Sequence, residues 1–333
     1  MDERVESERR IIVGTRGSDL ALWQSERVAE MLRAAHPDLE VELRVIETKG
    51  DRILDVALNS IGDKGLFTKE LENALLSGEA DIAVHSLKDL QTEIPEGLSL
   101  ACITERAYPE DALVASPGTT IASLPEGGTV ATGSLRRRAQ LLALRPDLQI
   151  VDVRGNVGTR LAKYRENGWD GMILARAGLV RLGLEDEIAE VIDPETMVPA
   201  VGQGALGIEI REGDQGVAHL LRSIEHRPTH ITSEAERAFL RHLEGGCQAP
   251  IGAYGTLSAA DGEEDREGDP VRYSIELHGV IASLDGTTIF RDSISRLISD
   301  NPDEADSIGI ELADRMLAEG GRGVLREIYG TSM

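Results

Sequence analysis

The segment 243–255 (LEGGCQAPIGAYG) contains the residue best suited to covalent chemistry, Cys247. This cysteine is one of only two in the chain, and it follows two glycines. Because glycine has no side chain and a permissive backbone, a bulky group could approach the Cys247 thiol closely. Most free cysteines are simply small buried hydrophobic residues, so the local sequence leaves a reactive thiol and a core residue as alternatives.

Residues 131–165 form a basic segment in an otherwise acidic chain. The segment has eight basic and two acidic residues, whereas the whole chain has a net charge of −24. Arginine suits bidentate binding of carboxylates and phosphates. Arg136 and Arg137 follow a predicted strand at the start of a predicted helix, and Arg154 and Arg160 flank the next such turn. We interpret these four arginines as anion-binding, and the other basic residues of the segment as a solvated helix face: Arg138, Arg145, Lys163 and Arg165.

Four polar residues occupy equivalent strand ends nearer the N-terminus: Arg16, Ser18, Ser86 and Lys88. In open α/β sheets, ligands bind at the carboxyl ends of the strands, where helix N-termini add backbone donors for anions. Together with the four arginines, these residues predict a cleft between two domains that binds a ligand with several carboxylates or phosphates. Asp89, directly after Lys88, could stabilise a positive intermediate or move a proton, although most Lys-Asp pairs are surface charges.

Short strands and helices alternate through most of the chain and must position these residues. Strands at 11–14, 41–47 and 81–84 with helices at 19–35 and 67–76 predict a parallel α/β domain, and residues 50–65 between them predict a loop. The pattern repeats in a second α/β unit, with strands at 112–115, 129–132, 150–153 and 171–175 and helices at 134–144, 156–166 and 177–182. The segment 198–210 is expected to return to the first domain. A helix at 232–243, strands near 252–256, 272–284 and 287–297, and a helix at 303–318 then predict a smaller α+β domain.

Composition limits the classes of partner and compartment. A strongly acidic chain lacks the basic footprint that phosphate contacts need, which argues against a nucleic-acid partner. Our hypothesis for the acidic excess is a high-salt cytoplasm, where acid-rich surfaces stay soluble. Neither a signal-peptide pattern nor an apolar run of membrane-spanning length is visible, and two cysteines do not make a disulfide framework. We therefore expect a soluble, cytoplasmic protein.

His226 and His230 have the i,i+4 spacing of a metal site on a helix. Pro228 lies between them and argues against a regular helix there. We therefore expect no metal at this pair.

Seven segments resemble the porphobilinogen deaminase (hydroxymethylbilane synthase) family, and they follow the order of that family. They are TRGSDLALWQ (15–24), GDKGLFTKELE (62–72), DIAVHSLKD (81–89), SLRRRAQL (134–141), RGNVGTRL (154–161), PAVGQGALGIE (199–209) and LEGGCQAPIG (243–252). Each segment alone could arise by chance, whereas seven in order extend the resemblance from Ile11 to about Tyr329.

This resemblance implies an enzyme, a transferase that joins four porphobilinogen molecules head to tail and releases ammonia at each step. Cys247 would carry a dipyrromethane cofactor through a thioether bond, and the enzyme would make this cofactor from its own substrate. Water would release the product, the linear tetrapyrrole hydroxymethylbilane. The implied fold has two α/β domains similar to two-lobed periplasmic binding proteins, at 9–104 with 203–224 and at 105–202, and a C-terminal α+β domain at 225–333. The family also suggests a monomer.

The resemblance implies a role for each matching residue. The catalytic set is Asp89, Lys88, Arg16, Arg154 and Arg160. The cofactor-binding set is Cys247, Ser86, Lys88, Asp89, Ser134, Arg136, Arg137 and Gly133. The substrate-binding set is Arg16, Ser18, Gln24, Lys64, Arg154, Arg160, Arg181 and Gln203. Asp89 would be the main catalytic carboxylate, and the cations would bind the acetate and propionate groups of the growing chain.

Three positions depart from the family pattern. Gly133 replaces a usual serine, Leu90-Gln91 replaces a usual Val-Pro, and Ser60 stands where relatives often carry lysine. A non-enzymatic two-lobed anion-binding protein is the alternative function, but it would not explain the Gly-Gly-Cys segment. A phosphate-handling transferase would need a P-loop or an acidic metal cluster, and the sequence has neither.

Overall fold

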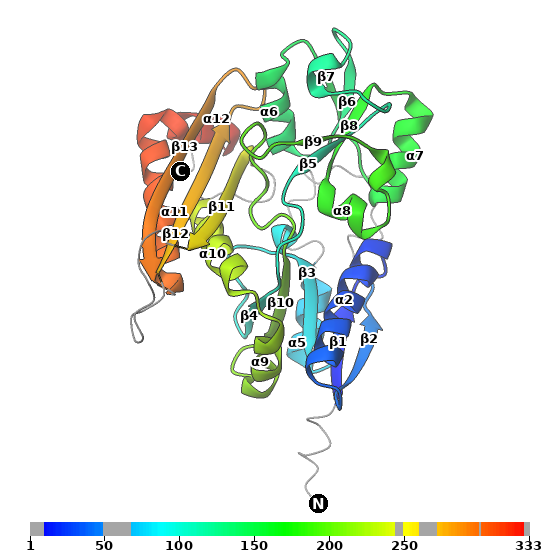
Figure 1. Ribbon diagram of the computed structural model, residues 1–333, viewed down its shortest axis with the longest axis vertical. Coiled ribbons are helices and arrows are strands. Elements are labelled where there is room, and N and C mark those ends of the chain that lie inside the picture. Colours follow the sequence, from blue (N-terminus) through cyan, green and yellow to red (C-terminus); the bar gives the residue numbers. More distant parts are fainter. Residues whose placement is uncertain (1–9, 49–67, 244–248, 260–271, 300, 330–333) are drawn as a thin grey trace, which may run out of the picture. The chain divides into compact units, whose positions relative to one another are not determined.

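We describe a computed structural model of the chain, covering residues 10–48, 68–243, 249–259, 272–299 and 301–329 (Figure 1). The predicted loop at 50–65 lies outside these residues. The chain forms two compact units. Unit 1 comprises residues 1–107, 181–183 and 204–229, and unit 2 comprises residues 108–180, 184–203 and 230–333. The finer domain boundaries given above stay a prediction.

Unit 1 is built on a five-stranded sheet with the order β2-β1-β3-β10-β4. Its strands are β1 (Arg10–Thr15), β2 (Glu40–Val45), β3 (Ile82–Ser86), β4 (Leu98–Ile103) and β10 (Leu206–Arg211). Strand β1 runs parallel to β2 and β3, whereas β10 runs antiparallel to β3 and β4. The three strands predicted to be parallel are parallel. The sheet as a whole is mixed, because the chain returns to it as antiparallel β10 between β3 and β4.

Helices cover both faces of the unit 1 sheet. The main ones are α2 (Asp19–Ala35), α5 (Lys69–Ser77) and α9 (Gln215–Leu221), with short turns η1 (Leu87–Asp89) and η4 (Arg222–Ile224). The apolar side of α2, including Val28 and Leu32, packs on one face of the sheet, and Leu71 and Leu75 of α5 pack on the other. Helix α2 begins at the predicted N-cap, since the Ser18 side chain accepts a hydrogen bond from the Ala21 backbone N–H.

Unit 2 contains a second five-stranded sheet of the same plan, with the order β7-β6-β8-β5-β9. Its strands are β5 (Asp111–Val114), β6 (Thr129–Ala131), β7 (Gln149–Val151), β8 (Gly171–Ala175) and β9 (Ile188–Ile192). Strands β7, β6 and β8 are parallel, and β5 is antiparallel to β8 and β9. The accompanying helices are α6 (Leu135–Leu144), α7 (Val157–Asn167), α8 (Arg176–Arg181), η2 (Ile121–Ser123) and η3 (Glu185–Glu187).

The C-terminal part of unit 2 is an antiparallel sheet with helices. The strands β11 (Ile251–Ala259), β12 (Arg272–Ala282) and β13 (Ile289–Ser299) follow one another in the sheet. The helices are α10 (Arg227–His242), α11 (Pro302–Met316) and α12 (Arg322–Tyr329), with the π-helical turn η5 (Leu317–Gly321) before α12. Phe239, Leu312 and Ile281 share one core that joins the sheet to α10 and α11 (Figure 1). The predicted fold class, two α/β domains followed by a smaller α+β domain, is confirmed.

The predicted start of α10 was wrong. The sequence predicts a start at Thr232, and Pro228 argues against a regular helix before it, yet the helix begins at Arg227. Pro228 is the second residue, in the first turn, where a missing N–H costs no intrahelical hydrogen bond. The imidazole of His226 lies just before the helix, and its Nδ1 is 2.8 Å from Thr229 Oγ1.

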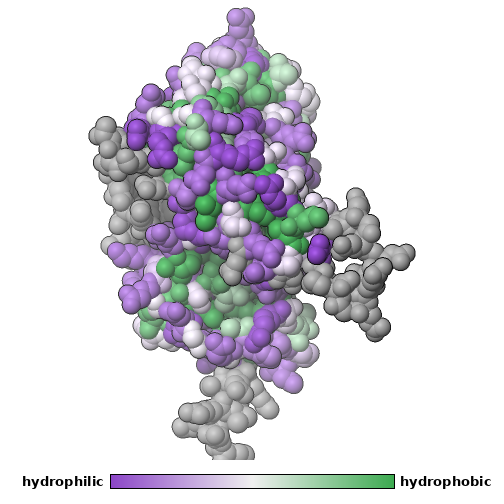
Figure 2. Space-filling view, turned by 90° about the vertical axis from the view of Figure 1, so that its left-hand side faces the viewer, coloured by the Kyte–Doolittle hydropathy of each residue, from purple (hydrophilic) through white to green (hydrophobic). Residues whose placement is uncertain are grey.

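The described surface carries many hydrophilic side chains, with smaller hydrophobic patches between them on the face drawn in Figure 2. Among the described residues, no helix is long and apolar enough to cross a membrane.

Candidate active site

In unit 1, the predicted site residues follow two adjacent parallel strands. Strand β1 leads into Arg16 and Ser18, and β3 leads into Ser86 and the 3₁₀ turn with Lys88 and Asp89. The two strands are paired in parallel, so their carboxyl ends lie at one edge of the sheet. The turn is anchored by Leu87, whose side chain is buried, while Lys88 is half-buried and Asp89 is exposed. The structure thus presents the Asp89 carboxylate to solvent on a fixed turn.

A hydrogen bond from α2 supports the end of β3. The side-chain amide of Gln24 is buried and donates to Ser86 Oγ at 2.8 Å. On the preceding turn, Thr15 Oγ1 donates to the Ala21 carbonyl at 3.2 Å. These two bonds connect α2 to the carboxyl ends of β1 and β3.

Arg181 also belongs to unit 1. Its Nη2 donates to the Gly204 carbonyl at 2.6 Å, and its guanidinium carbon lies 5.6 Å from the centre of the Trp23 ring. Burial lowers the pKa of Arg181 to about 10, so the side chain remains a cation at neutral pH.

In unit 2, the predicted residues lie at two helix N-termini that follow adjacent parallel strands. Strand β6 precedes α6, where Ser134 Oγ accepts from the Arg137 N–H at 3.4 Å, and β7 precedes α7, where Asn156 Oδ1 accepts from the Thr159 N–H at 2.8 Å. The Ser134 cap uses the hydroxyl oxygen as an acceptor, so its proton can still be donated to a ligand. Both helix ends point backbone N–H groups toward the same edge of the sheet.

The Arg154 turn is held by its own neighbours. Arg160 Nε donates to the Gly155 carbonyl at 2.8 Å, and Lys163 Nζ donates to the Arg154 carbonyl at 3.2 Å. Arg154 Nε also lies 3.5 Å from an Asp152 carboxylate oxygen. Lys163, which we had assigned to a solvated face, therefore supports the backbone of a predicted site residue.

A buried carboxylate that sequence reasoning missed organises the other two arginines. Asp111 is completely buried at the start of β5 and forms ion pairs of 2.8 Å with both Arg136 and Arg137. Burial by itself would raise the pKa of Asp111, but the two guanidiniums hold that pKa well below its usual range. Gln203, predicted as a cleft residue, is also buried and donates to Asp111 Oδ1 at 2.8 Å. No local pattern marks Asp111, because its partners lie 25, 26 and 92 residues along the chain.

Two family models match the chain one after the other. The model "Porphobilinogen deaminase, dipyromethane cofactor binding domain" matches residues 11–219, and "Porphobilinogen deaminase, C-terminal domain" matches residues 230–318. The chain belongs to the porphobilinogen deaminase family. This confirms the resemblance found in the seven sequence segments.

Relatives named porphobilinogen deaminase match nearly the whole chain. Those of Pelobacter propionicus and Geobacter sulfurreducens are each 49% identical, over 96% of this chain and 98% and 95% of their own lengths. Among solved structures, the periplasmic VFT2 domain of Bordetella pertussis BvgS is 16% identical over 67% of this chain and 89% of its own, with a TM-score of 0.39. That structural similarity is too low to support a functional conclusion.

The structure accounts for two departures from the family pattern. A Cβ atom at Gly133 would lie 2.8 Å from the Val153 carbonyl oxygen, so a serine at this position would require the backbone to shift. Leu90 is buried in a cluster with Leu87 and Ile103, which fixes the chain directly after Asp89. Cys247, Lys64 and Ser60 lie outside the described residues, and their predicted roles rest on the sequence.

The residues of unit 2 fit an anionic cofactor. Arg136 and Arg137 are paired with the single carboxylate of Asp111, which leaves one positive charge in excess. The Nε atom of Arg136 is buried and has no hydrogen-bond acceptor among the described residues. Because a dipyrromethane carries acetate and propionate groups, a ligand carboxylate could balance both the charge and the donor.

Proposed function

We propose that the protein is a porphobilinogen deaminase that condenses four porphobilinogen molecules into hydroxymethylbilane and releases ammonia at each step of tetrapyrrole biosynthesis. The observation that carries this proposal is the succession of two deaminase family models over residues 11–219 and 230–318. The exposed carboxylate at the end of β3 supports it, because the condensation needs a negative group beside a cationic pyrrole.

Asp89 is the proposed catalytic carboxylate. It stabilises the protonated pyrrole nitrogens and assists the departure of ammonia, while its own turn is held by buried Leu87. Lys88 and Arg16, at the same edge of the unit 1 sheet, bind carboxylates of the substrate. Arg154 and Arg160 complete the proposed catalytic set from unit 2. The remaining substrate contacts are proposed for Ser18, Gln24, Lys64, Arg181 and Gln203.

Cys247 is the proposed attachment point of the dipyrromethane through a thioether bond. When bound, this group supplies the pyrrole to which the first substrate is joined. Ser86 and Ser134 donate hydrogen bonds to it, Lys88 and Asp89 contact it, and Arg136 and Arg137 bind or orient its carboxylates. The proposed contact of Gly133 with the cofactor is through its backbone, since a Cβ atom at this position would meet the Val153 carbonyl.

We also propose that the protein is a cytoplasmic monomer adapted to high salt, with neither nucleic acid nor membrane as a partner. The net charge of −24 and the pI near 4.7 support this proposal.

The first test is the intact mass of the purified protein beside a Cys247→Ser variant. We expect the wild type to carry the extra mass of two linked pyrroles and the variant to lack it. If the fresh wild type is unmodified, incubation with porphobilinogen should add this mass and release ammonia. A wild type that binds porphobilinogen but never gains the mass or releases ammonia would be an anion-binding protein, and the proposal would be wrong.

A second test concerns Asp89. We expect Asp89→Asn to lower kcat by about 10²- to 10⁴-fold, the range of positioned acid–base groups. The matched control is Asp38→Asn, which changes an exposed aspartate outside the predicted site. This variant should keep wild-type turnover. Near-normal turnover by the Asp89 variant would remove this carboxylate from the mechanism.

A further inference from the structure

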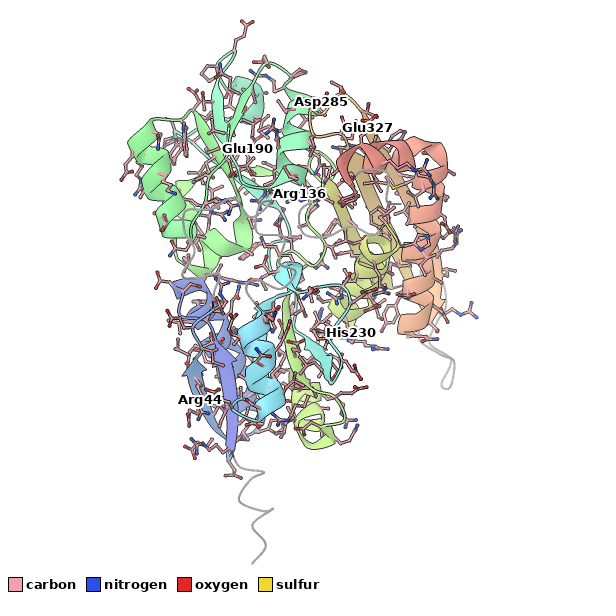
Figure 3. The ribbon with its side chains drawn as sticks, turned by 180° about the vertical axis from the view of Figure 1, so that it is seen from behind. Arg44, Arg136, Glu190, His230, Asp285 and Glu327 are labelled. Carbon is pink, nitrogen blue, oxygen red and sulfur yellow. The ribbon has the colours of Figure 1, made fainter. Side chains whose placement is uncertain are left out.

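Arg176 follows directly after strand β8, at the edge of the unit 2 sheet that carries the candidate site residues. Strands β7, β6 and β8 run parallel, so their carboxyl ends lie at one edge. Ser134 follows β6 and Arg154 follows β7 at this edge, and Arg136 lies there in the first turn of α6 (Figure 3). Because ligands of open α/β sheets bind at the carboxyl ends of strands, the side chain that follows β8 is placed among groups that meet a ligand.

The segment before β5 lies beside the end of β8. Strand β5 is antiparallel to β8, and its first residue, Asp111, pairs with Ala175. The Arg176 backbone N–H donates to the Glu110 carbonyl at 3.0 Å, and Arg176 Nη1 donates to Glu110 Oε1 at 3.2 Å. The Arg176 guanidinium carbon also lies 4.3 Å from the centre of the Tyr108 ring, within the range of a cation–π contact. Tyr108, Glu110 and Arg176 therefore form one group, which we call the Arg176 cluster.

The backbone of Tyr108 fixes the ring of this cluster. The φ of Tyr108, +47°, is the only positive φ of a non-glycine residue in the described part of the chain. A side chain in this left-handed region is unfavourable, so the conformation persists where the surrounding structure holds it. The next residue supplies such a hold, since the Pro109 carbonyl accepts from Gln203 Nε2 at 2.7 Å. The tyrosine ring is thus held against the Arg176 guanidinium.

The guanidinium of Arg176 keeps donors that the protein does not use. The Arg176 side chain is 28% exposed, and Tyr108 is exposed as well. Nη1 donates to Glu110, whereas Nε and Nη2 have no acceptor among the described residues. A guanidinium stays charged and suits planar carboxylates, and stacking on a ring leaves the edges of its plane open. The Arg176 cluster therefore presents a fixed cation to solvent at the ligand-binding edge of the sheet.

We propose that Arg176 binds an acetate or propionate group of a substrate pyrrole, and that Tyr108 is a positioning residue that holds the Arg176 guanidinium. The proposal rests on the deaminase function and adds a subsite after β8 to the groups that follow β6 and β7. Glu110 fixes one nitrogen of the guanidinium and lowers the net charge of the cluster. Removing the charge of Glu110 therefore strengthens the attraction for a carboxylate, whereas removing the charge of Arg176 abolishes it.

The test measures kcat and KM for porphobilinogen, by ammonia release, in full-chain variants that carry the same fraction of covalent cofactor by intact mass. Arg176→Gln removes the cation, Arg176→Lys keeps the charge without the planar fork, and Glu110→Gln removes the neighbouring negative charge. The matched control is Arg165→Gln, because Arg165 also pairs with a glutamate, Glu187, but lies in the last turn of α7. Circular dichroism and the denaturation midpoint show whether each variant is folded at the assay temperature.

We expect Arg176→Gln to raise KM by about tenfold, the size of one lost hydrogen bond to a charged group. The kcat should be nearly unchanged, because the contact binds the substrate and the transition state alike. Arg176→Lys should raise KM less. Glu110→Gln should leave KM equal to or below the wild-type value, and Arg165→Gln should match the wild type.

Tyr108→Asn tests the positioning role, since asparagine tolerates a positive φ but has no ring. We expect KM to rise about threefold, the scale of an exposed cation–π contact. Tyr108→Phe, which keeps the ring, should match the wild type. An unchanged KM in Tyr108→Asn would remove the positioning role of Tyr108.

A purely structural ion pair would give Arg176→Gln and Glu110→Gln the same defect, and that result would overturn the proposal. Wild-type KM in folded Arg176→Gln would also overturn it. If Arg176→Gln fails to fold, the opposite expectations for Arg176→Lys and Glu110→Gln still decide the outcome. A wild-type protein that neither gains the adduct nor releases ammonia would refute the proposed function itself. A wild type that does both, with an unaffected Arg176→Gln variant, would refute only the subsite after β8.

Discussion

Buried side chains that pair across the fold accompany the candidate site residues in both units. In unit 1, His85 Nε2 lies 3.2 Å from a Glu209 carboxylate oxygen, with both side chains buried directly before Ser86. Burial raises the pKa of nearby Glu72, and the negative charge of Glu209 adds to the effect. The sequence allowed prediction of Ser18 as a cap and of the cations at strand ends, because those depend on local position. The pairing of His85 with Glu209, and of Asp111 with its arginines, depends on strands brought together by the fold.

The raised pKa of Glu72 predicts the pH dependence of stability. A carboxyl group with a raised pKa favours the folded state below its unfolded pKa, near 4.5, and this contribution is lost as the pH rises through the folded value. We therefore expect Glu72→Gln to increase the free energy of unfolding at pH 7 by about 1 kcal/mol, a typical single-substitution effect, and to leave it nearly unchanged near pH 4. Urea denaturation at the two pH values measures this.

The control is Glu79→Gln, because Glu79 is exposed. The stability of this variant should show no such pH dependence. A Glu72→Gln variant that is less stable than the wild type at pH 7 would show that the Glu72 carboxylate is stabilising in its ionised form.

At the scale of elements, prediction succeeded where local signals are strong. The cap and apolar period of α2 are such signals. The helices predicted at 67–76 and 156–166 end within one residue of the ends of α5 and α7. The short strands β4 and β9 and the helices α9 and α12 were not predicted, because their sequences are short and only partly alternate. Within the segment 198–210, expected to return to the first domain, strand β10 begins at Leu206. The residues before it form turns and hold Gln203 on Asp111. The antiparallel position of β10 is a property of the whole sheet that no segment of sequence expresses.

The turn between β12 and β13 predicts how the C-terminal sheet is attached within unit 2. Gly286 has a φ of +71°, and a Cβ there would lie 2.6 Å from the Ala139 carbonyl oxygen and the Ala143 nitrogen of α6. Gly286→Ala should therefore destabilise the protein by more than the roughly 1–2 kcal/mol of the left-handed backbone alone. Arg291 of β13 donates to the Glu195 and Thr196 carbonyls at 2.9 and 2.8 Å. In the Gly286→Ala variant, displacement of the turn from α6 should break these two hydrogen bonds.

Gly118→Ala is the matched control for this element. Gly118 has a φ of +81° with nothing within 4 Å of its Cβ position, so it reports the backbone cost without the contact to α6. Thermal denaturation of both variants gives the difference. Equal losses of stability would show that the turn does not rely on its close approach to α6.

At the scale of the whole molecule, the net negative charge affects stability independently of the fold. Acidic residues outnumber basic ones by 59 to 35, and the many surface carboxylates repel one another in dilute salt. The basic segment at 131–165 is the exception, and in the structure two of its arginines are buried on Asp111 rather than spread over the surface. The acidic excess therefore belongs to the solvated surface, and its cost to stability depends on the surrounding ions.

This surface predicts how stability responds to salt. Simple screening is almost complete by about 1 M salt, where the Debye length is about 3 Å. If the acidic surface is adapted to a high-salt cytoplasm, the melting temperature should keep rising from about 0.1 M to about 3 M KCl, beyond the range of screening. Calorimetry across this series, with the fraction of covalent cofactor held constant by intact mass, measures the effect. A melting temperature that stops rising below about 1 M KCl would show that screening of charge repulsion accounts for the whole effect. A melting temperature that does not rise at all would contradict the adaptation.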